Sequence, residues 1–401
     1  MEPQAVRVKR MPTTPRPHDT AHFIIIFLLV SLNLRMAFSA ADPLLSQVKH
    51  ALGLGIGGSG LFALLPIMAL GVAAPMGARL VEWIRPGNLI TCALLLATVG
   101  VVWRSSGHLA GLFCGTIIIG LGLGVAGSVI LGIVKQAVPN HLPEVMSAYT
   151  ACVSLGTAIG SGAAVPVAQL LDGWQSGLMF WALPMLLASI LWALMMHRQQ
   201  NLHTRQPAMR APMLPLLKKR NARMVTLYYL FRVASSWLLI VWLATLLHMR
   251  GMDTIKAGLV LSLATACQIP SALLSGIVIR WLGGIRLLMT LATLLAVAAC
   301  WGLLVAPPGF WLISSITLGV GLGSIFSVGM TLIASTEPDE AGTIALSGLA
   351  QGIGFTAGGL LAWAAGAGMG TGNPCLALTL LYTLFALCGL YFGLRCGKDS
   401  E

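Results

Sequence analysis

Apolar runs of about 20 residues follow one another along the whole chain, and this repetition constrains the fold more than any single motif does. A run of that length spans a bilayer as an α-helix, whereas the strands of a membrane β-barrel would alternate over about ten residues. Only 9% of the 401 residues are charged, against about 25% in a soluble domain. The sequence therefore predicts an all-α membrane protein with twelve transmembrane helices, at 22–46, 58–81, 87–105, 109–136, 144–171, 177–197, 223–248, 255–280, 285–306, 310–335, 341–367 and 375–396.

The basic residues mark one side of the membrane. If the N-terminus is cytoplasmic, 18 of the 24 Lys and Arg residues fall on cytoplasmic segments and four fall outside, namely Lys49, Arg104, Arg250 and Lys256. Cytoplasmic loops carry such an excess of positive charge, so both termini are expected in the cytoplasm. The predicted organisation is a cytoplasmic tail (1–21), an N-terminal six-helix bundle (22–197), a cytoplasmic linker (198–222), a C-terminal six-helix bundle (223–396) and a second tail (397–401).

The two predicted bundles repeat one another at a nearly constant offset. Three sets of glycines recur: Gly120, Gly122 and Gly124 at Gly319, Gly321 and Gly323 (offset 199), Gly156 and Gly160 at Gly354 and Gly358 (198), and Gly77 at Gly276 (199). Arg35 and Arg232 differ by 197, so the two arginines are expected at equivalent positions of the two halves.

Both arginines lie inside apolar segments. A helix that begins near residue 22 carries Arg35 roughly 20 Å into a hydrocarbon core of about 30 Å, while Arg232 follows the start of its helix more closely. Either guanidinium could pair with a carboxylate, and Arg232 could reach an interface. None of the twelve acids lies in mid-helix; the nearest, Asp42, is expected two turns beyond Arg35 on the same helix face. Because a buried unpaired charge costs several kcal/mol, an anionic substrate between the arginines is the favoured interpretation.

Short motifs in this arrangement resemble a known family. Two parallel six-helix repeats joined by a cytoplasmic linker resemble the major facilitator superfamily end to end. Within it, the chain resembles the family of cyanate-type transporters and nitroimidazole-type exporters. The motifs are Asn33-Leu34-Arg35 with Pro43-Leu44-Leu45, Ile133-Val134-Lys135, Ala148-Tyr149-Thr150, Trp242-Leu243 and the run from Leu346 through Gln351 to Phe355. The resemblance implies a central cavity lined by the first and seventh helices, and hence by both arginines.

The resemblance also implies a gating loop after the second helix. The superfamily usually has a glycine there, then an acid four residues on and basic residues, whereas this chain spaces the corresponding residues differently. Asp42 departs from the pattern too, because a small or neutral residue is expected before the Pro-Leu-Leu motif. No carboxylate or histidine lies in mid-membrane, so Asp42 is the candidate carrier if protons are coupled. The coupling or gating candidates are Asp42, Lys135, Arg79, Glu82 and Arg85, of which Lys135 is alternatively an interfacial lysine.

Polar and aromatic residues within the apolar segments complete the candidate binding site. Gln351 and Gln268 either hydrogen-bond a neighbouring helix or contact the substrate. Trp237 and Trp242 face either lipid or the cavity. The substrate-binding candidates are Arg35, Arg232, Asn33, Tyr149, Gln351, Trp237, Trp242, Gln268, Phe355 and Tyr229.

Enzyme chemistry is not supported by the sequence. The eight histidines fall near helix ends or in loops, and no carboxylate pair or metal-ligand spacing is present. Gly122-x-Gly124-x-x-Gly127 matches a dinucleotide-binding pattern, but it lies inside an apolar helix and therefore indicates close helix packing. The eight cysteines, in or at the ends of apolar segments, indicate no disulfide framework. The net charge of +12 is concentrated in loops of one parity, which argues against a nucleic-acid partner.

The sequence therefore predicts a secondary active or facilitative transporter, without cofactor or metal, in a bacterial inner membrane. The expected substrate is a small anion, cyanate-like or a small organic acid, held between Arg35 and Arg232 during alternating access. Protons are a candidate coupling ion, and a monomer is expected. One alternative is an exporter of small neutral or aromatic compounds such as nitroimidazoles, with a cavity lined by Trp237, Trp242, Phe355 and Tyr229. A second alternative is a membrane sensor without transport.

Overall fold

The structure, a computed structural model, describes residues 17–53, 56–200, 213–367 and 373–396. Both expected tails, apart from 17–21, and residues 201–212 of the expected linker lie outside the described residues. Within those ranges the regular structure is helical and contains no strand. Eleven of the described helices are long and apolar enough to cross a membrane, and α3 adds a shorter apolar stretch at Leu64–Leu80. The expected all-α membrane fold is confirmed.

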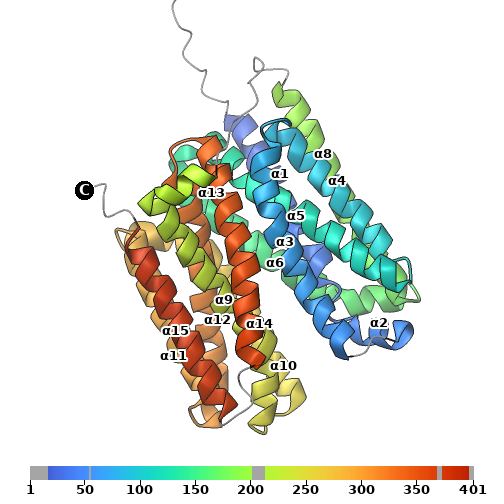
Figure 1. Ribbon diagram of the computed structural model, residues 1–401, viewed down its shortest axis with the longest axis vertical. Helices are drawn as coiled ribbons and strands as arrows, with labels where there is room; N and C mark the ends of the chain where they lie inside the picture. The colour runs from blue at the N-terminus through green and yellow to red at the C-terminus, as the bar shows by residue number, and fades with distance from the viewer. Residues whose placement is uncertain (1–16, 54–55, 201–212, 368–372, 397–401) are drawn as a thin grey trace, which may run out of the picture.

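The helices form two groups, which Figure 1 shows side by side. The first group contains α1 (Pro17–Ser39), α2 (Leu45–Leu52), α3 (Ile56–Leu80), α4 (Pro86–Arg104), α5 (Leu109–Ala137), α6 (Leu142–Leu170), α7 (Trp174–Met179) and α8 (Ala182–Gln200). The second contains α9 (Arg220–Met249), α10 (Thr254–Trp281), α11 (Ile285–Leu304), α12 (Trp311–Thr336), α13 (Glu340–Ile353), α14 (Gly359–Ala367) and α15 (Pro374–Leu394).

Three of the predicted helices are interrupted. The first, expected at 22–46, ends at Ser39, because Pro43 disfavours a helical residue before it. The sixth, expected at 177–197, is split into α7 and α8, and Pro184 there cannot donate a hydrogen bond to the Phe180 carbonyl. The eleventh, expected at 341–367, contains a π-helical turn at Gly354–Gly358 between α13 and α14.

The recurring glycines of α5 and α12 make equivalent contacts in the two groups, whereas Gly77 meets α5 of its own group and Gly276 meets α6 of the other group. A Cβ at Gly120 or Gly124 of α5 would collide with α3, and one at Gly122 would collide with α4. In the second group, Gly319 and Gly323 of α12 meet α10 in the same way, while Gly321 meets α11. Small residues at these positions let the helix backbones approach closely. The packing interpretation of the glycine motif is therefore confirmed, and the internal repeat is a repeat of helix contacts.

The two groups contact each other near the end of the molecule where α8 ends and α9 begins, here called the linker end. The Lys135 side chain donates a hydrogen bond to the backbone carbonyl of Glu337, and the Arg280 Nε lies 2.9 Å from a Glu144 oxygen. Further from the linker end, the hydroxyl groups of Ser147 and Ser327 are 2.9 Å apart. These contacts close the linker end between the two groups.

Candidate functional site

Glycine contacts fix the position of Arg35 on α1. A Cβ at Gly156 of α6 would overlap the carbonyl oxygen of Leu32, and one at Gly160 would overlap that of Met36. These two carbonyls flank Arg35 in the sequence. The α6 backbone is therefore pressed against α1 beside Arg35, an approach that only glycine permits.

The repeat places Arg232 on α9 in a comparable setting. A Cβ at Gly354 would collide with the ring of Tyr229, and one at Gly358 would come within 2.9 Å of the Leu230 carbonyl oxygen. Arg232 is the thirteenth residue of α9, because that helix begins at Arg220, three residues before its expected start. At 1.5 Å per residue it lies about 18 Å into the helix. The Nε and Nη1 atoms of its guanidinium are buried, which argues against the interfacial position that the sequence left open for Arg232.

Arg35 and Arg232 come together with two tyrosines. Arg35 lies within electrostatic range of Arg232, and both arginines are within range of Tyr149 on α6 and Tyr229 on α9. The arginines are half-buried and the tyrosines are buried. We call these four residues the arginine cluster. Its chemistry is that of a cationic site rich in hydrogen-bond donors, supplied by α1, α6 and α9.

Within the part of the chain that the structure describes, the Arg232 guanidinium has aromatic neighbours but no acidic partner. Its central carbon lies 4.3 Å from the ring centroid of Phe326 on α12 and 5.0 Å from that of Tyr229. Its Nε and Nη1 atoms are buried without a hydrogen-bond partner, as is the Tyr229 hydroxyl. Such orphan donors are costly in a protein interior, and a ligand that accepts hydrogen bonds would satisfy them. Phe326 was not among the residues that the sequence singled out.

Among the described residues, Asp42 is the one acid within electrostatic range of Arg35. It lies in the turn between α1 and α2, not two helical turns beyond Arg35 as expected, because α1 ends at Ser39. Its side chain is reached by solvent, yet the protein crowded around the carboxyl removes enough water to raise its pKa to about 6. The positive charges of Arg104 and Arg35 oppose that rise. A carboxyl with this pKa exchanges its proton near physiological pH.

Arg104 is a buried residue that the sequence assigned to an outside segment. It is the last residue of α4, its side chain is only 1% exposed, and its Nη2 donates a 2.7 Å hydrogen bond to the Ala37 carbonyl of α1. Its positive charge acts on Asp42 more strongly than that of Arg35 does. The sequence contains one signal for such a role: Arg104 lies at the outer end of its helix, where the positive-inside rule disfavours an arginine.

Two predicted polar candidates hydrogen-bond other protein groups. The Asn33 amide donates to the Leu29 carbonyl, one turn back in α1, at 2.9 Å. Asn33 is two residues from Arg35, so it projects from the opposite side of the helix. The Gln351 amide donates to the Gly127 carbonyl of α5 at 3.2 Å and to the Ser347 hydroxyl at 2.8 Å. Gln351 therefore links α13 to α5 across the two groups, the first of its two expected roles.

The remaining lining candidates are spread over the second group. Phe355 lies in the π-helical turn, and its ring meets that of Tyr229 edge-on, with centroids 5.9 Å apart. Trp237 and Trp242 are half-buried on α9, and the Trp242 indole nitrogen is buried without a partner. Gln268 on α10 is half-buried, and its backbone packs against Gly323. Of these four, Phe355 is joined to the arginine cluster by a ring contact.

The predicted gating residues divide into two sets. Lys135 bridges the two groups at the linker end through the Glu337 carbonyl. Arg79 and Glu82 are exposed and Arg85 is half-buried, and within the described ranges none of the three forms an ion pair with the second group. The ion pair that spans the groups there is instead Glu144 with Arg280.

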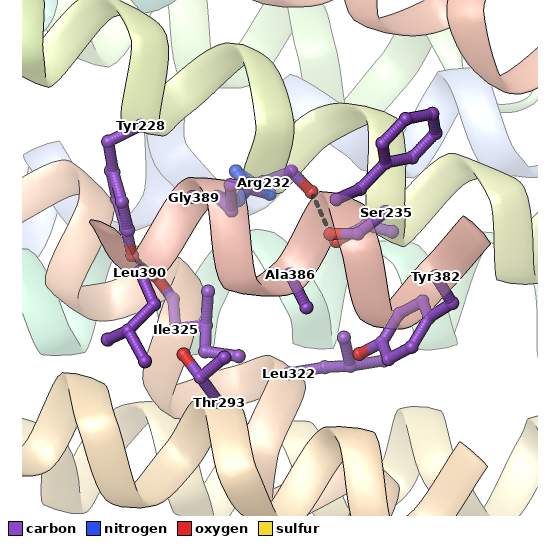
Figure 2. Close-up of a pocket in the computed structure, with 12 residues that line it drawn as sticks. Tyr228, Arg232, Ser235, Thr293, Leu322, Ile325, Tyr382, Ala386, Gly389 and Leu390 are labelled. Carbon is purple, nitrogen blue, oxygen red and sulfur yellow. Dashed lines mark hydrogen bonds between the residues drawn. The ribbon is translucent and has the colours of Figure 1, made fainter. Parts of the chain in front are cut away.

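A small cavity lies within the second group beside Arg232 (Figure 2). Its volume is about 10 Å³, enough for a single water molecule. The Ser235 hydroxyl on its wall donates to the Arg232 backbone carbonyl at 2.9 Å, and Tyr228 donates to the Ile325 carbonyl at 3.0 Å. The cavity is too small for an organic substrate, and of the four residues of the arginine cluster it is lined by Arg232 alone.

Comparison with known sequences gives consistent matches over nearly the whole chain. The sequence profile of the Major Facilitator Superfamily matches residues 26–367. The 2-nitroimidazole transporter of Escherichia coli (strain K12) is 28% identical over 390 residues, covering 93% of this chain and 95% of that protein. The uncharacterized transporter YycB of Bacillus subtilis (strain 168) is 27% identical, covering 85% and 86%. The cyanate transport protein CynX of E. coli (strain K12) is 26% identical, covering 86% and 88%.

Solved structures share the fold. The structure of FucP, a Major Facilitator Superfamily transporter in the outward conformation, superposes with a TM-score of 0.74 at 16% identity, covering 95% of this chain and all of that one. The proton:xylose symporter XylE, bound to 6-bromo-6-deoxy-D-glucose, gives a TM-score of 0.75 at 12% identity and covers 96% of both chains. At these identities the likeness concerns the fold alone.

Proposed function

Because the chain belongs to the Major Facilitator Superfamily and is a multi-pass membrane transporter, not an enzyme, we propose that it carries a small anion between Arg35 and Arg232. Transport proceeds by alternating access, in which the two groups of helices rock about the central site. The anion is cyanate-like or a small organic acid. It is drawn to the arginine cluster because that region holds two positive charges.

The observation that carries this proposal is the lack of a counter-ion. Among the described residues, neither arginine lies in an ion pair, and Arg232 has two buried donors without partners. Leaving buried donors unsatisfied costs about 1–3 kcal/mol for each group, and more for charged ones. An anion that accepts hydrogen bonds from both guanidiniums would recover that free energy.

The named relatives support two substrate classes. One relative is a cyanate transport protein, and cyanate is a small anion. Another is a 2-nitroimidazole transporter, which favours the second candidate function, export of small neutral or aromatic compounds. The rings of Tyr229, Phe326 and Phe355 beside Arg232 are consistent with a flat ligand. Dependence on Arg35 separates the two classes, because a neutral compound gains little from a second positive charge.

The proposed setting is the bacterial inner membrane, with both termini and the linker end in the cytoplasm. The excess of basic residues on those segments supports this orientation. In that orientation the described state is closed toward the cytoplasm by the Lys135, Glu144 and Arg280 contacts. The arginine cluster would then receive substrate from the outer side.

Cysteine labelling tests the orientation. Gln206→Cys, in the linker outside the described residues, is expected to escape an impermeant thiol reagent in intact cells, because the linker is cytoplasmic. Asp253→Cys is the matched control, since this exposed residue precedes α10 at the opposite end and is expected to react. The native cysteines are replaced beforehand so that each variant carries one thiol. Labelling at 206 together with protection at 253 would reverse the orientation.

Asp42 is the proposed proton carrier. Because its pKa is about 6, it is ionised above that pH and repels an anion approaching Arg35, whereas below that pH it is neutral. Anion binding is therefore expected to strengthen as the pH falls through about 6. Asp42→Asn, which is always neutral, is expected to lose this pH dependence, to lower proton-driven uptake and to spare substrate exchange. The measurement is uptake and exchange in proteoliposomes across that pH range.

The control is Asp253→Asn, an exposed acid at the same end of the molecule, which is expected to keep the parental pH profile. If Asp42→Asn keeps that profile too, Asp42 has no part in coupling.

A further inference from the structure

Two aromatic rings cover the guanidinium of Arg232, and we call Phe326 and Tyr229 the aromatic clamp. The distances of 4.3 and 5.0 Å from the guanidinium carbon to the ring centroids are those of cation–π contacts. Phe326 comes from α12 and Tyr229 from α9, one turn before Arg232. Phe326 is half-buried and has no polar atom, so its contribution here is made through its ring.

The clamp leaves a specific requirement unmet. All N–H bonds of a guanidinium lie in one plane, and aromatic faces do not accept them as a carboxylate does. The buried Nε and Nη1 of Arg232 therefore still lack acceptors. Two oxygens in the guanidinium plane, as in a carboxylate, accept from one edge of the guanidinium at a time, either from Nη1 together with Nη2 or from Nε together with Nη2, so a single carboxylate satisfies one of the two orphan donors. A tetrahedral oxyanion also offers two oxygens, but a third projects out of the plane toward the negative faces of the clamp rings.

Arg35 has no equivalent clamp. The guanidinium of Arg35 has one ring contact, at 5.6 Å, with Phe38 on its own helix. The glycine offset of 199 maps Phe326 onto Gly127, which has no ring and whose carbonyl accepts from Gln351. Of the two arginines, Arg232 is therefore the one with ring contacts from two side chains, whereas the described residues give Arg35 a single and longer one.

We propose that Phe326 is a positioning residue that fixes the plane of the Arg232 guanidinium and thereby makes the site select planar carboxylates over tetrahedral oxyanions. This inference rests on the proposed anion site between Arg35 and Arg232. Phe326 would select the shape of the anion within that site, whereas the positive charges of the arginines select only for a negatively charged substrate.

Matched ligand pairs test the selection. The pairs are acetate with methylphosphonate and benzoate with phenylphosphonate. The members of each pair carry the same methyl or phenyl group, and they are compared at a pH where both have one negative charge. Dissociation constants come from thermal-stabilisation titrations of the purified full-length protein. The parent is expected to bind each carboxylate at least about tenfold more tightly than its phosphonate. Phe326→Leu is expected to bring that ratio close to one, while Phe326→Tyr, which keeps the ring, retains the preference.

Two further variants make the test decisive. Phe326→Met keeps most of the side-chain volume without a ring, and it replaces Phe326→Leu if that variant does not fold. Phe392→Leu removes a ring of the second group that stacks on Phe231, 5.8 Å between centroids, and it is expected to leave the ratio unchanged. The ratio is the decisive quantity because a merely destabilised protein would lose both ligands together.

The failures of the two proposals are distinguishable. If the parent binds these anions only when Arg35 is present but shows no preference, or if the ringless variants keep the preference, the role of Phe326 is refuted and the anion site stands. If no anion binds in an Arg35-dependent manner, the proposed function fails and the inference fails with it.

Discussion

Arg35→Ala is expected to abolish uptake of the anion and Arg35→Lys to retain little of it, while both proteins fold and reach the membrane. Arginine can hold a carboxylate-like group with two parallel hydrogen bonds, which the single ammonium of lysine cannot. Loss of such a charge-assisted contact costs on the order of 2–4 kcal/mol, or about 30- to 1000-fold in affinity. Uptake into proteoliposomes and ligand-induced thermal stabilisation of the purified variants measure the loss.

Arg232→Ala is expected to lower the affinity for the anion by a factor in the same range. The guanidinium of Arg232 has two buried donors without partners, which supports a direct contact with the anion over the milder role of a residue near a helix end. Size-exclusion profiles equal to the parent's serve as the folding control for each arginine variant. An Arg35→Ala protein that binds and carries the anion as the parent does would refute the proposed site and favour the exporter of neutral compounds.

Gly156→Ala is expected to destabilise the protein and to lower transport. A Cβ there would overlap the Leu32 carbonyl oxygen, so α6 and the α1 segment that carries Arg35 must separate. Overpacking of this kind costs about 1–3 kcal/mol. Gly162→Ala is the matched control. Gly162 lies on the same helix, and a Cβ there would meet no neighbouring atom within 4 Å. The substitution brings the same gain in helix propensity as Gly156→Ala.

The difference in melting temperature between these two alanine variants separates the effect of the collision from the effect of alanine on helix stability. We expect Gly156→Ala to melt at a lower temperature than the parent and Gly162→Ala to melt at the same or a higher temperature. Equal melting temperatures and equal uptake rates for the two variants would show that the α1–α6 contact tolerates separation.

The parts of the fold that follow from sequence are those encoded by regular spacing. Apolar runs of membrane-spanning length predict the helices, and the offset of 199 between Gly120 and Gly319 predicts the repeated packing that the structure contains. The similar offset between Arg35 and Arg232 predicts that they belong together, and the structure brings them within electrostatic range of each other. Such features depend on chain length and glycine position, both of which are visible in the sequence.

The features that escaped prediction depend on tertiary contacts. Phe326 reads as an ordinary residue of an apolar helix until α12 brings its ring over Arg232. Arg104 reads as a loop residue until its guanidinium is found bonded to the Ala37 carbonyl. The π-helical turn at Gly354–Gly358 changes the register within a helix and leaves no sequence pattern that distinguishes it from the equivalent, regular stretch of α6.

Helix geometry explains the misplaced Asp42. Asp42 was placed on the face of Arg35 by extending the helix past Ser39, where Pro43 in fact ends it. The error arose from a helical rule applied beyond the end of the helix. Asn33 stays a predicted binding residue, although two residues correspond to about 200° around a helix, so its side chain and that of Arg35 diverge.

Ligand-induced thermal stabilisation of the parent and of the double variant Arg35→Ala/Arg232→Ala tests the central claim most directly. The panel contains cyanate, small organic acids and neutral aromatic compounds of matched size. We expect anions to stabilise the parent, and we expect this stabilisation to disappear in the double variant although that variant remains folded. Stabilisation of both proteins by neutral aromatic compounds alone, without any effect of the anions, would refute the anion site between Arg35 and Arg232.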